Sequence, residues 1–554
     1  MNKSIQIIVA FVSFFVLNSC GISKSIQHKP ILTGYNNQIP EVIKHNDSLF
    51  SSGKNYLIKN KQQLWELHVS GDALERGLTI GSLTQPLIHK QEKVFFSKIE
   101  SIVPSKFKLS LLRQFLKWYN RKLYLHVPEE FKTEIYGVSQ YASDDYEKIA
   151  PKYLRSLYLH GAHDIGHALQ DLALVGCSSL AVWGDKSEDG SLVVGRNFDF
   201  YAGDEFAEDK IIAFITPKKG HPFMMVTWGG MIGVVSGMNK EGLSITINAG
   251  KSEIPLVAKT PISILAREIL QYASTIEEAI AIAKSREVFV AESIMVSSAK
   301  DKKAILIEVS PDNFGVFEVE NNNQLVCSNH FQSASYKDDK RNSNHIVESH
   351  SKYRFDRMNE LLSEEEKMNP LKVADILRNK EGLENIDLGY GNEKALNQLL
   401  AHHGIIFKPE QRMVWVSSNP YQLGEFVAYD LNKIFDTKEV KFETVGTQEF
   451  NIPEDNFINS KAFKSYEKYR VLDREIDISL ENNQEISPEK VKIYQNANPN
   501  LWIVYYKIGN YYYDKGWLKA AEIQFEKALT KEVTTLPSKV VIEKKLKSIK
   551  RKLN

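Results

Sequence analysis

Three side chains that can support nucleophilic catalysis occur near one another in the middle of the 554-residue chain. Cys177 opens a run of small and apolar residues, and Arg196 and Asp199 follow it by 19 and 22 residues. A thiol attacks as its thiolate, and a nearby guanidinium favours that form. A carboxylate at the same place can orient a base or an amine. The alternative is a cysteine that packs in a strand as a small hydrophobe, near an ordinary pair of Arg and Asp.

The residues between the cysteine and the aspartate have the pattern of a β-hairpin. A β-type run covers residues 180–183, Asp189-Gly190 favours a turn, and apolar residues return at 192–194. In an antiparallel pair, the start of the first strand lies beside the end of the second. We therefore expect the cysteine, the arginine and the aspartate to meet at one edge of a sheet.

Residues 195–199 read Gly-Arg-Asn-Phe-Asp. With Cys177 upstream, this stretch resembles the N-terminal-nucleophile amidohydrolases of the choloylglycine hydrolase, acid ceramidase and penicillin acyltransferase (peptidase C45) group. In that group the mature catalytic chain begins with cysteine and carries a Gly-Arg-Asn-x-Asp motif after a hairpin. The resemblance covers roughly residues 65–430. It implies an α+β fold, a four-layer αββα sandwich, that acts on a linear amide without a cofactor.

The same resemblance implies that the chain cleaves itself between Gly176 and Cys177. An internal cysteine has no free α-amine, and attack of its thiol on the preceding carbonyl releases one that then serves as the base. Glycine suits position 176 because it tolerates strained backbone angles and leaves the carbonyl open to attack. We expect a fragment of about residues 21–176 and a catalytic chain of residues 177–554.

Further site residues follow from the resemblance. Asn248 and Asn329 each end a β-type run, where the matching asparagines of the family hold the substrate carbonyl or its oxyanion. An ordinary strand-ending asparagine is the alternative for Asn248. Residues 351–357 match a segment that gives an arginine to the site; Arg354 fits best, and Arg357 stays an alternative.

The resulting mechanism is hydrolysis of an N-acyl amide through a thioester on the cysteine. If an amine instead of water accepts the acyl group, the same residues make an acyltransferase. A hypothesis of another class is a catalytically idle, surface-anchored interaction protein. The acyl and amine parts of the substrate are not specified by these patterns.

Two groups of histidines have alternative interpretations. His160, His163 and His167 have the spacing of ligands on one helical face, which permits a zinc site. However, glycines interrupt that helix, and no carboxylate or cysteine set completes the ligands. We expect structural histidines and no metal there, and we also predict structural roles for His402 and His403.

The first 20 residues have the pattern of a targeting signal. Lys3 precedes an apolar run over residues 5–17, which is too short to span a bilayer comfortably. The run ends in Leu17-Asn18-Ser19-Cys20, which resembles a bacterial lipobox. Lipidation of Cys20 would anchor the protein to a membrane of the cell envelope, on an extracytoplasmic side (periplasmic or outer membrane). An ordinary secretory signal is the alternative.

The composition predicts a soluble body behind this anchor. Hydrophobic residues make up 43% of the chain, which is enough for a substantial core, and the formal net charge of +1 argues against nucleic-acid binding. The chain divides into a signal peptide (1–20), a spacer (21–60), a helical pro-segment (61–176), a catalytic domain (177–435), a linker (436–490) and a helical end (491–554).

The helical end has the residue pattern of a tetratricopeptide repeat. The matching positions include Trp502, Gly509, Tyr512, Phe525 and Pro537. An isolated repeat is seldom stable. Either less regular helices over residues 458–494 supply neighbours, or the repeat docks on the catalytic domain. A helical surface of this kind also predicts a protein partner.

After the hairpin, short apolar runs predict an antiparallel meander, followed by two helices and further strands. Thr275 and Glu278 form a capping-box pattern at the start of the second helix. The predicted meander strands cover residues 211–215, 223–227, 232–235 and 243–248.

Overall fold

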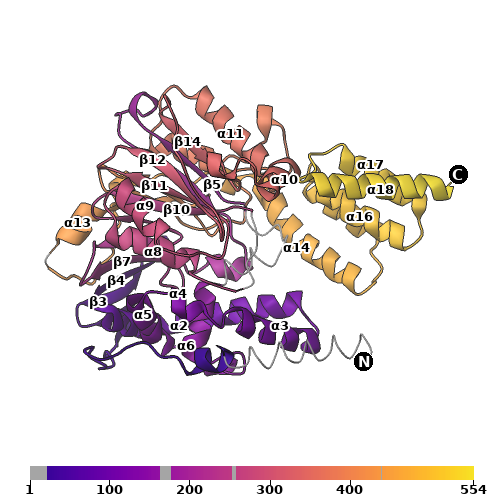
Figure 1. Ribbon diagram of the computed structural model, residues 1–554. Coiled ribbons are helices and arrows are strands. Elements are labelled where there is room, and N and C mark those ends of the chain that lie inside the picture. The colour runs from indigo at the N-terminus through magenta and orange to yellow at the C-terminus, as the bar shows by residue number, and fades with distance from the viewer. Residues whose placement is uncertain (1–20, 162–175, 252–256, 438, 554) are drawn as a thin grey trace.

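The computed structural model describes residues 21–161, 176–251, 257–437 and 439–553. Within these residues the centre of the molecule consists of two stacked β-sheets with helices on their outer faces (Figure 1). The larger sheet has the strand order β1-β2-β3-β4-β7-β8-β9-β10-β11-β12-β13, and the smaller has the order β14-β5-β6-β15-β16-β17.

The strands of the larger sheet come from both sides of the expected cleavage point. They are β1 (Ile43–Asn46), β2 (Leu49–Ser52), β3 (Asn55–Lys59), β4 (Trp65–Gly71), β7 (Ile211–Pro217), β8 (Phe223–Thr227), β9 (Ser236–Asn239), β10 (Leu243–Ala249), β11 (Glu292–Ser298), β12 (Lys303–Val309) and β13 (Phe314–Phe317). Strand β4 pairs with β7 in parallel, so the pro-segment is an integral part of the sheet.

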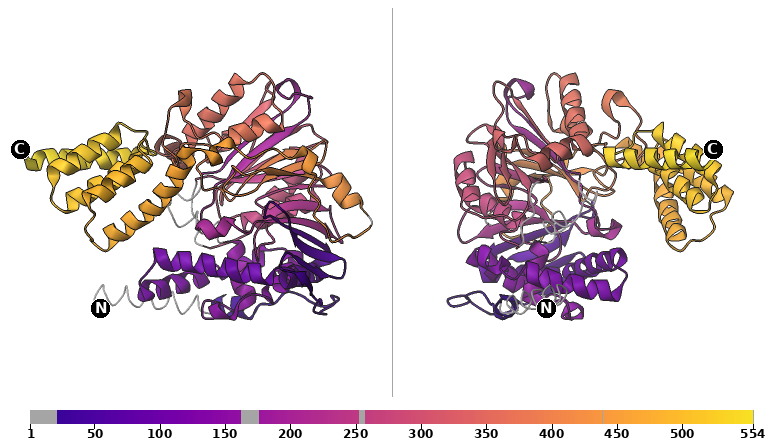
Figure 2. Two further views of the ribbon diagram at one scale, coloured as in Figure 1. Left: turned by 180° about the vertical axis from the view of Figure 1, so that it is seen from behind. Right: turned by 45° about the vertical axis from the view of Figure 1, so that its right-hand side comes forward.

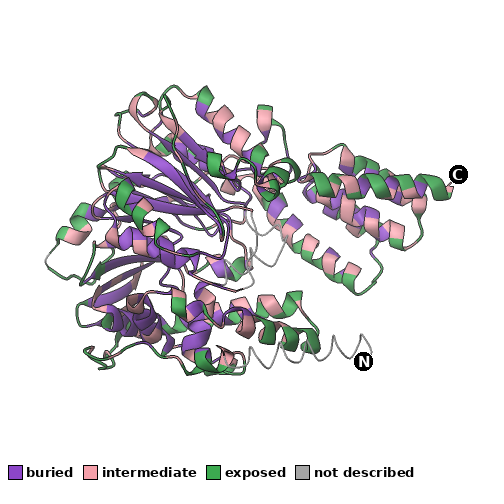
Figure 3. Cartoon of the chain, viewed as in Figure 1, coloured by how far each residue is buried: buried purple, intermediate pink, exposed green. Residues whose placement is uncertain are grey.

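The smaller sheet lies entirely after the expected cleavage point. It contains β14 (Gln324–Cys327), β5 (Ser178–Val182), β6 (Val193–Phe198), β15 (His403–Lys408), β16 (Met413–Ser417) and β17 (Phe426–Asp430). Alternate residues of its strands face opposite sides: Ala181 packs against the larger sheet, and Leu180 packs against helices on the outer face. The buried strands of both sheets are visible at the centre of Figure 3.

Three apolar clusters separate four layers of secondary structure. The first lies between the larger sheet and its helices, the second between the two sheets, and the third between the smaller sheet and its helices. This arrangement confirms the predicted αββα sandwich. The helices on the larger sheet are α2 (Ala73–Ile102), α5 (Glu129–Ser139), α6 (Lys152–His160), α8 (Ile262–Tyr272) and α9 (Ile276–Lys284), and those on the smaller sheet are α11 (Ser351–Glu364) and α12 (Pro370–Leu377).

Local signals fix the starts of several helices. Asp72 and Glu75 form a capping box that begins α2, and Thr275 and Glu278 form the predicted one that begins α9. Further helices of this part of the chain are α3 (Lys106–Tyr119), α4 (Leu123–His126), α10 (Lys340–Glu348) and α13 (Leu431–Asp436).

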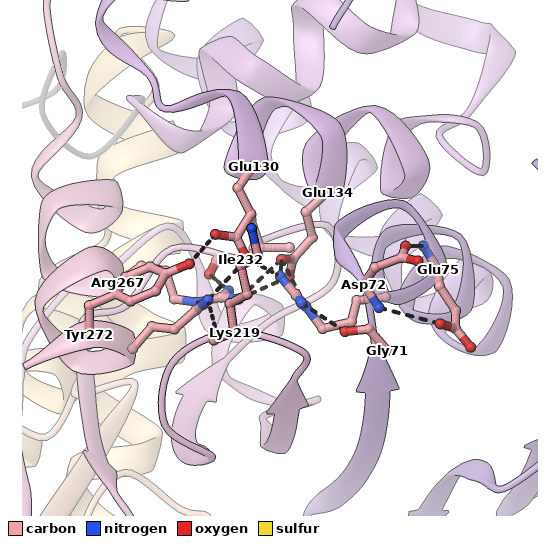
Figure 4. A network of polar contacts seen from close by, with 11 residues as sticks. Gly71, Asp72, Glu75, Glu130, Glu134, Lys219, Ile232, Arg267 and Tyr272 are labelled. Atoms are coloured by element: carbon pink, nitrogen blue, oxygen red, sulfur yellow. Dashed lines mark hydrogen bonds and ion pairs between the residues drawn. The ribbon is translucent and has the colours of Figure 1, made fainter. Parts of the chain in front are cut away.

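A buried network of charges joins the pro-segment to the catalytic part, and we call it the Glu134 network (Figure 4). Glu134 of α5 accepts hydrogen bonds from Arg76 of α2 and from Arg267 of α8. Glu130 of α5 accepts from Arg76, and it also accepts from Tyr272 of α8. Helices on the two sides of the expected cleavage point are therefore held together by paired charges.

Two predicted stretches differ from the structure, the spacer and one strand of the meander. The expected spacer contains β1, β2 and β3, whose backbones pair in the larger sheet. Strand β1 is exposed along its whole length, so it has no apolar alternation that a sequence pattern could reveal. In the meander, residues 232–235 precede β9 instead of forming it, because the backbone N–H of Val234 donates to Ser263 at the start of α8.

The second half of the expected linker contains a helix, within the stretch (residues 458–494) where less regular helices were one predicted alternative. Helix α14 (Lys461–Glu481) packs with α15 (Pro488–Ala497), α16 (Trp502–Asp514), α17 (Leu518–Leu529) and α18 (Leu536–Leu553) around one apolar cluster. Leu399 and Leu423 of the catalytic part belong to the same cluster. Both expected sources of support for the helical end are thus present, while its assignment as a tetratricopeptide repeat stays a prediction.

Helices α16 to α18 stand to one side of the sandwich in all views (Figure 2). Across the described ranges, no helix combines the length and the hydropathy that a membrane span requires. The predicted signal peptide and Cys20 lie outside the described residues.

Candidate active site

The hairpin formed by β5 and β6 brings Arg196 to the nucleophile candidate. Cys177 directly precedes β5, and Ser178 and Ser179 pair with Asn197 and Arg196 of β6. The Nη2 atom of Arg196 lies 3.6 Å from Sγ of Cys177. The prediction that a hairpin places these two side chains together is confirmed.

Arg196 is fully buried and held in one orientation. Its guanidinium donates to the backbone carbonyls of Val235 (3.3 Å) and Ile247 (2.5 Å) and to the hydroxyl of Ser236 (2.7 Å). It also lies over the ring of Phe198, 4.2 Å from the centroid. None of these partners is a carboxylate, so its positive charge is available to the sulfur.

The thiol of Cys177 is protected from solvent in the intact chain. It is 1% exposed, and burial raises the pKa of the thiol. The charge of Arg196 and a hydrogen bond from the backbone N–H of Asp199 oppose this shift, and the carboxylate of Asp199 adds to it. The intact chain therefore holds Cys177 as a thiol with groups in place to stabilise its thiolate.

Asp199 is an unusual buried acid. It is fully buried, and neither carboxylate oxygen has a hydrogen-bond partner within the described part of the chain. Burial raises the pKa of Asp199 to about 7, against the opposing charges of Arg354 and Arg196. Its backbone carbonyl accepts from the N–H of Gly176 at 3.3 Å, so Asp199 flanks the expected cleavage point.

Arg354 approaches the same point from α11. Its Nη1 donates to the carbonyls of Gly176 (2.8 Å) and Cys177 (2.6 Å) and to the hydroxyl of Ser178 (2.9 Å). Burial lowers the pKa of Arg354 to about 10, which leaves it charged at neutral pH. Arg357 instead donates to Glu360, Asn379 and Asn385. Of the two candidate arginines, the structure places Arg354 at the site.

The two predicted oxyanion donors have different surroundings. Asn329 accepts from Nη2 of Arg354 at 2.6 Å, and its amide group donates to the carbonyl of Ala249 at 2.9 Å. Because an amide NH2 has two N–H groups, one contact of this kind leaves a donor for a substrate oxygen.

The amide group of Asn248 donates to the carbonyls of Cys327 and Ser328, both at 3.3 Å. Its oxygen accepts from Ser179 at 2.8 Å. These contacts tie β10 to the smaller sheet, and they engage both N–H groups of Asn248. The geometry therefore favours the alternative of a structural asparagine, and its role as an oxyanion donor stays a prediction.

Sequence reasoning did not identify Gln398, which is 2% exposed. Its Nε2 donates to the carbonyl of Gly176 at 3.1 Å. Gln398 lies in a loop before β15, 222 residues beyond its acceptor, and belongs to no motif that would have revealed it.

The two adjacent histidines form a chain that ends at the site. Nδ1 of His402 lies 2.9 Å from Nδ1 of His403, and Nε2 of His403 lies 2.9 Å from the Ser236 hydroxyl, which contacts Arg196. Burial lowers the pKa of both histidines well below the usual value. They are neutral supports of the arginine, in keeping with the structural role predicted for them.

His160 also has structural contacts. Its Nδ1 lies 2.8 Å from the carbonyl of Ser156, and its Nε2 accepts from the N–H of Ile232 at 3.0 Å. His163 and His167 lie outside the described residues. Among the residues that are described, no three or more His, Cys, Asp or Glu side chains gather as metal ligands would.

An apolar cavity of about 50 Å³ lies next to the end of β6. Its lining includes Phe200, Phe206 and Trp228 of the catalytic part, together with Ile88 of α2 and Leu159 of α6. This volume is far below the roughly 300–1,000 Å³ of ordinary ligand pockets. The intact chain therefore has no room for an acyl group there, although the lining is apolar.

Part of the chain matches a known enzyme family. Residues 186–419 match the model of the family described as acyl-coenzyme A:6-aminopenicillanic acid acyl-transferase. This range contains every predicted site residue except Gly176, Cys177 and the lipidation candidate Cys20.

Two curated proteins are similar in sequence. An uncharacterized protein of Archaeoglobus fulgidus is 27% identical over 270 residues, which cover 45% of this chain and 44% of that protein. Protein dcd1B of Dictyostelium discoideum is 22% identical over 298 residues, which cover 50% of this chain and 55% of that protein. The chain thus spans about half the length of these relatives.

Two solved structures show a partial likeness to this chain. The Caenorhabditis elegans ortholog of N-acylethanolamine-hydrolyzing acid amidase is 18% identical, with 42% of this chain and 93% of that chain covered and a TM-score of 0.32. Conjugated bile acid hydrolase from Clostridium perfringens is 16% identical, with coverage of 48% and 95% and a TM-score of 0.32. These scores are low, and the fold assignment rests on the four layers described above.

Proposed function

We propose that this protein is a self-processing N-terminal-nucleophile hydrolase that cleaves a linear N-acyl amide through a thioester on Cys177. The observation that carries the proposal is the pairing of the buried thiol with Arg196, beside the carboxylate of Asp199, which has no hydrogen-bond partner within the described residues. The thiol of the intact chain is 1% exposed, which hinders the access of a substrate from solution. In this proposal the intact chain is the precursor.

The unpartnered carboxylate supports self-processing. A buried carboxylate without a partner costs several kcal/mol if it ionises, so such groups persist where they have a function. Cleavage before Cys177 would create an α-amine close to Asp199, whose backbone already contacts both Gly176 and the sulfur. The new α-amine would then donate a hydrogen bond to the carboxylate, which would orient it as the base.

In turnover, the thiol of Cys177 gives its proton to the α-amine, and the thiolate attacks the acyl carbon. Arg196 stabilises the thiolate, and the remaining N–H of Asn329 is the donor for the oxyanion. The carbon–nitrogen bond breaks as the α-ammonium returns the proton to the leaving amine. Water then attacks the thioester, which releases the carboxylic acid and restores the thiol.

Acyl transfer to an amine is the second candidate function. The observation that favours it is the match of residues 186–419 to a family of acyl-transferases. The same thioester serves both outcomes, and the acceptor that reaches it decides between them.

Two proposals concern the location and partners of the protein. We propose that lipidated Cys20 anchors it to a membrane of the cell envelope, on an extracytoplasmic side. We also propose that the helical end binds a protein partner, because α16 to α18 project from the sandwich (Figure 2).

The first experiment is intact-mass analysis of the chain without residues 1–20, beside Cys177→Ala. We expect two fragments that meet between Gly176 and Cys177 in the first protein and one chain in the variant. A panel of N-acyl amides, with and without an acceptor amine, then separates hydrolysis from acyl transfer. An active preparation that contains only uncleaved chain would contradict self-processing.

A further inference from the structure

The carbonyl of Gly176 is bound by two side-chain donors in the intact chain. Nη1 of Arg354 lies 2.8 Å from its oxygen, and Nε2 of Gln398 lies 3.1 Å from the same oxygen. All three residues are buried. Two N–H donors on one carbonyl oxygen, shielded from water, have the geometry of an oxyanion hole.

Glycine at position 176 leaves the space that the side-chain amide of Gln398 occupies. A Cβ atom at position 176 would lie 2.1 Å from Nε2 of Gln398, well inside van der Waals contact. A side chain there would displace the amide from the carbonyl. The sequence suggested strained backbone angles as the reason for glycine at this position, and the structure supplies a different one, the close approach of a hydrogen-bond donor.

We propose that Gln398 and Arg354 form the oxyanion hole for self-cleavage, with Gln398 as a catalytic residue of that step. This inference rests on the proposed function. The donors polarise the carbonyl of Gly176 and stabilise the negative charge that its oxygen acquires when Sγ of Cys177 attacks the carbon.

The step balances without a cofactor. A bond forms between Sγ and the carbonyl carbon of Gly176, and the bond from that carbon to the nitrogen of Cys177 breaks. The thiol proton passes to this nitrogen, which becomes the α-amine. Water hydrolyses the thioester, which leaves a carboxyl group on Gly176 and restores the thiol.

The oxyanion hole proposed for self-cleavage differs from the oxyanion donor expected during substrate turnover. Gln398 contacts the carbonyl of Gly176, which belongs to the other fragment after cleavage. Asn329 accepts from Nη2 of Arg354, not from the Nη1 atom that binds the carbonyl of Gly176, and it is 5% exposed. Self-cleavage and substrate hydrolysis therefore use different amide donors around one shared arginine.

The test follows the rate of cleavage in the full chain without residues 1–20, made by cell-free translation and sampled over time by intact mass. We expect Gln398→Leu to slow cleavage about 100- to 1,000-fold, the usual effect of removing one oxyanion donor. Gln422→Leu is the matched control, because Gln422 is fully buried and its side-chain amide has no hydrogen-bond partner within the described residues. The control is expected to cleave at nearly the wild-type rate.

A second pair of variants keeps the test decisive if Gln398→Leu does not fold. Gly176→Ala should also slow cleavage, because the new methyl group displaces Nε2. Combined with Gln398→Ala, it should add little further loss, since both changes remove the same contact.

The possible outcomes distinguish a failure of this inference from a failure of the proposed function on which it rests. A wild-type chain that stays intact overturns both. Cleavage of folded Gln398→Leu at the wild-type rate, or fully additive losses in the double variant, overturns the role of Gln398 alone.

Discussion

The Glu134 network and the cluster around Cys177 are both buried sets of charges, yet they are built in opposite ways. In the network, Glu134 receives hydrogen bonds from two arginines, and its side chain and those arginines are at most 1% exposed. At the site, Asp199 has no hydrogen-bond partner within the described residues, and Arg196 donates mainly to carbonyls and a hydroxyl.

This difference separates structural charges from reactive ones. Paired charges compensate one another, so removal of one partner leaves the other buried and unpaired. The buried carboxylate of Asp199, which has no partner within the described residues, is costly to ionise. The α-amine released by cleavage would lower this cost by pairing with it. Substitutions in the Glu134 network are therefore expected to change the free energy of unfolding. Substitutions around Cys177 are expected to change the rates of cleavage and turnover.

The largest expected effect tests the chemistry at the sulfur. Cys177→Ala should abolish both self-cleavage and amide turnover, because no other group at that point can form the thioester. Cys327→Ala is the control, since Cys327 is equally buried and lies on the neighbouring strand β14. Fragment masses and release of amine from an N-acyl amide measure the two activities. Equal losses in both variants would contradict the assignment of the nucleophile.

The next effect concerns the unpartnered acid. Asp199→Asn keeps the shape of the side chain and should slow turnover about 100- to 10,000-fold, the range for loss of a group that positions or moves a proton. In the uncleaved background Cys177→Ala, the same substitution should not lower the free energy of unfolding, because it removes an uncompensated buried acid. Kinetics of the processed enzyme and urea unfolding of the uncleaved variant measure the two quantities. A destabilised variant with normal turnover would reverse the comparison.

The network should show the opposite result. Among the described residues, Glu134→Ala leaves Arg267 buried without an acidic partner and Arg76 with Glu130 alone, and it should lower the free energy of unfolding by about 3–5 kcal/mol. The rate of cleavage in the folded fraction should stay near that of wild type. Urea titration and fragment analysis measure these outcomes. As a control, the exposed ion pair of Lys352 and Asp356 should contribute about 1 kcal/mol or less. A loss of cleavage without loss of stability would show that the network is not purely structural.

The last prediction is a dependence of stability on pH in the uncleaved variant Cys177→Ala. The pKa of Asp199 is raised from 3.8 to about 7 in the folded chain. Between these values the folded chain keeps a proton that the unfolded chain has lost, so stability falls as pH rises, by at most about 1.4 kcal/mol per pH unit. Adding Asp199→Asn should remove this slope. A slope that remains in the double variant would assign it to other groups.

Patterns within short stretches predicted much of the site. The residues between Cys177 and Asp199 predict a hairpin that brings Arg196 to the cysteine. Pairing within a hairpin depends on residues that are close in sequence, and the structure confirms it. The capping box at Thr275 and Glu278 is local for the same reason. The prediction failed where no local pattern exists: strand β1 is exposed along its whole length and pairs through its backbone.

The sequence by itself determined the nucleophile candidate and the hairpin that presents it, because both depend on neighbouring residues. The four-layer class was an implication of the family resemblance that the motif carries. Only the tertiary structure decided which distant groups surround Gly176. It selected Arg354 over Arg357, assigned Asn248 to contacts between sheets, and placed Gln398 on a carbonyl 222 residues away. Side-chain contacts across such separations depend on how whole layers pack, and no spacing along the chain encodes them.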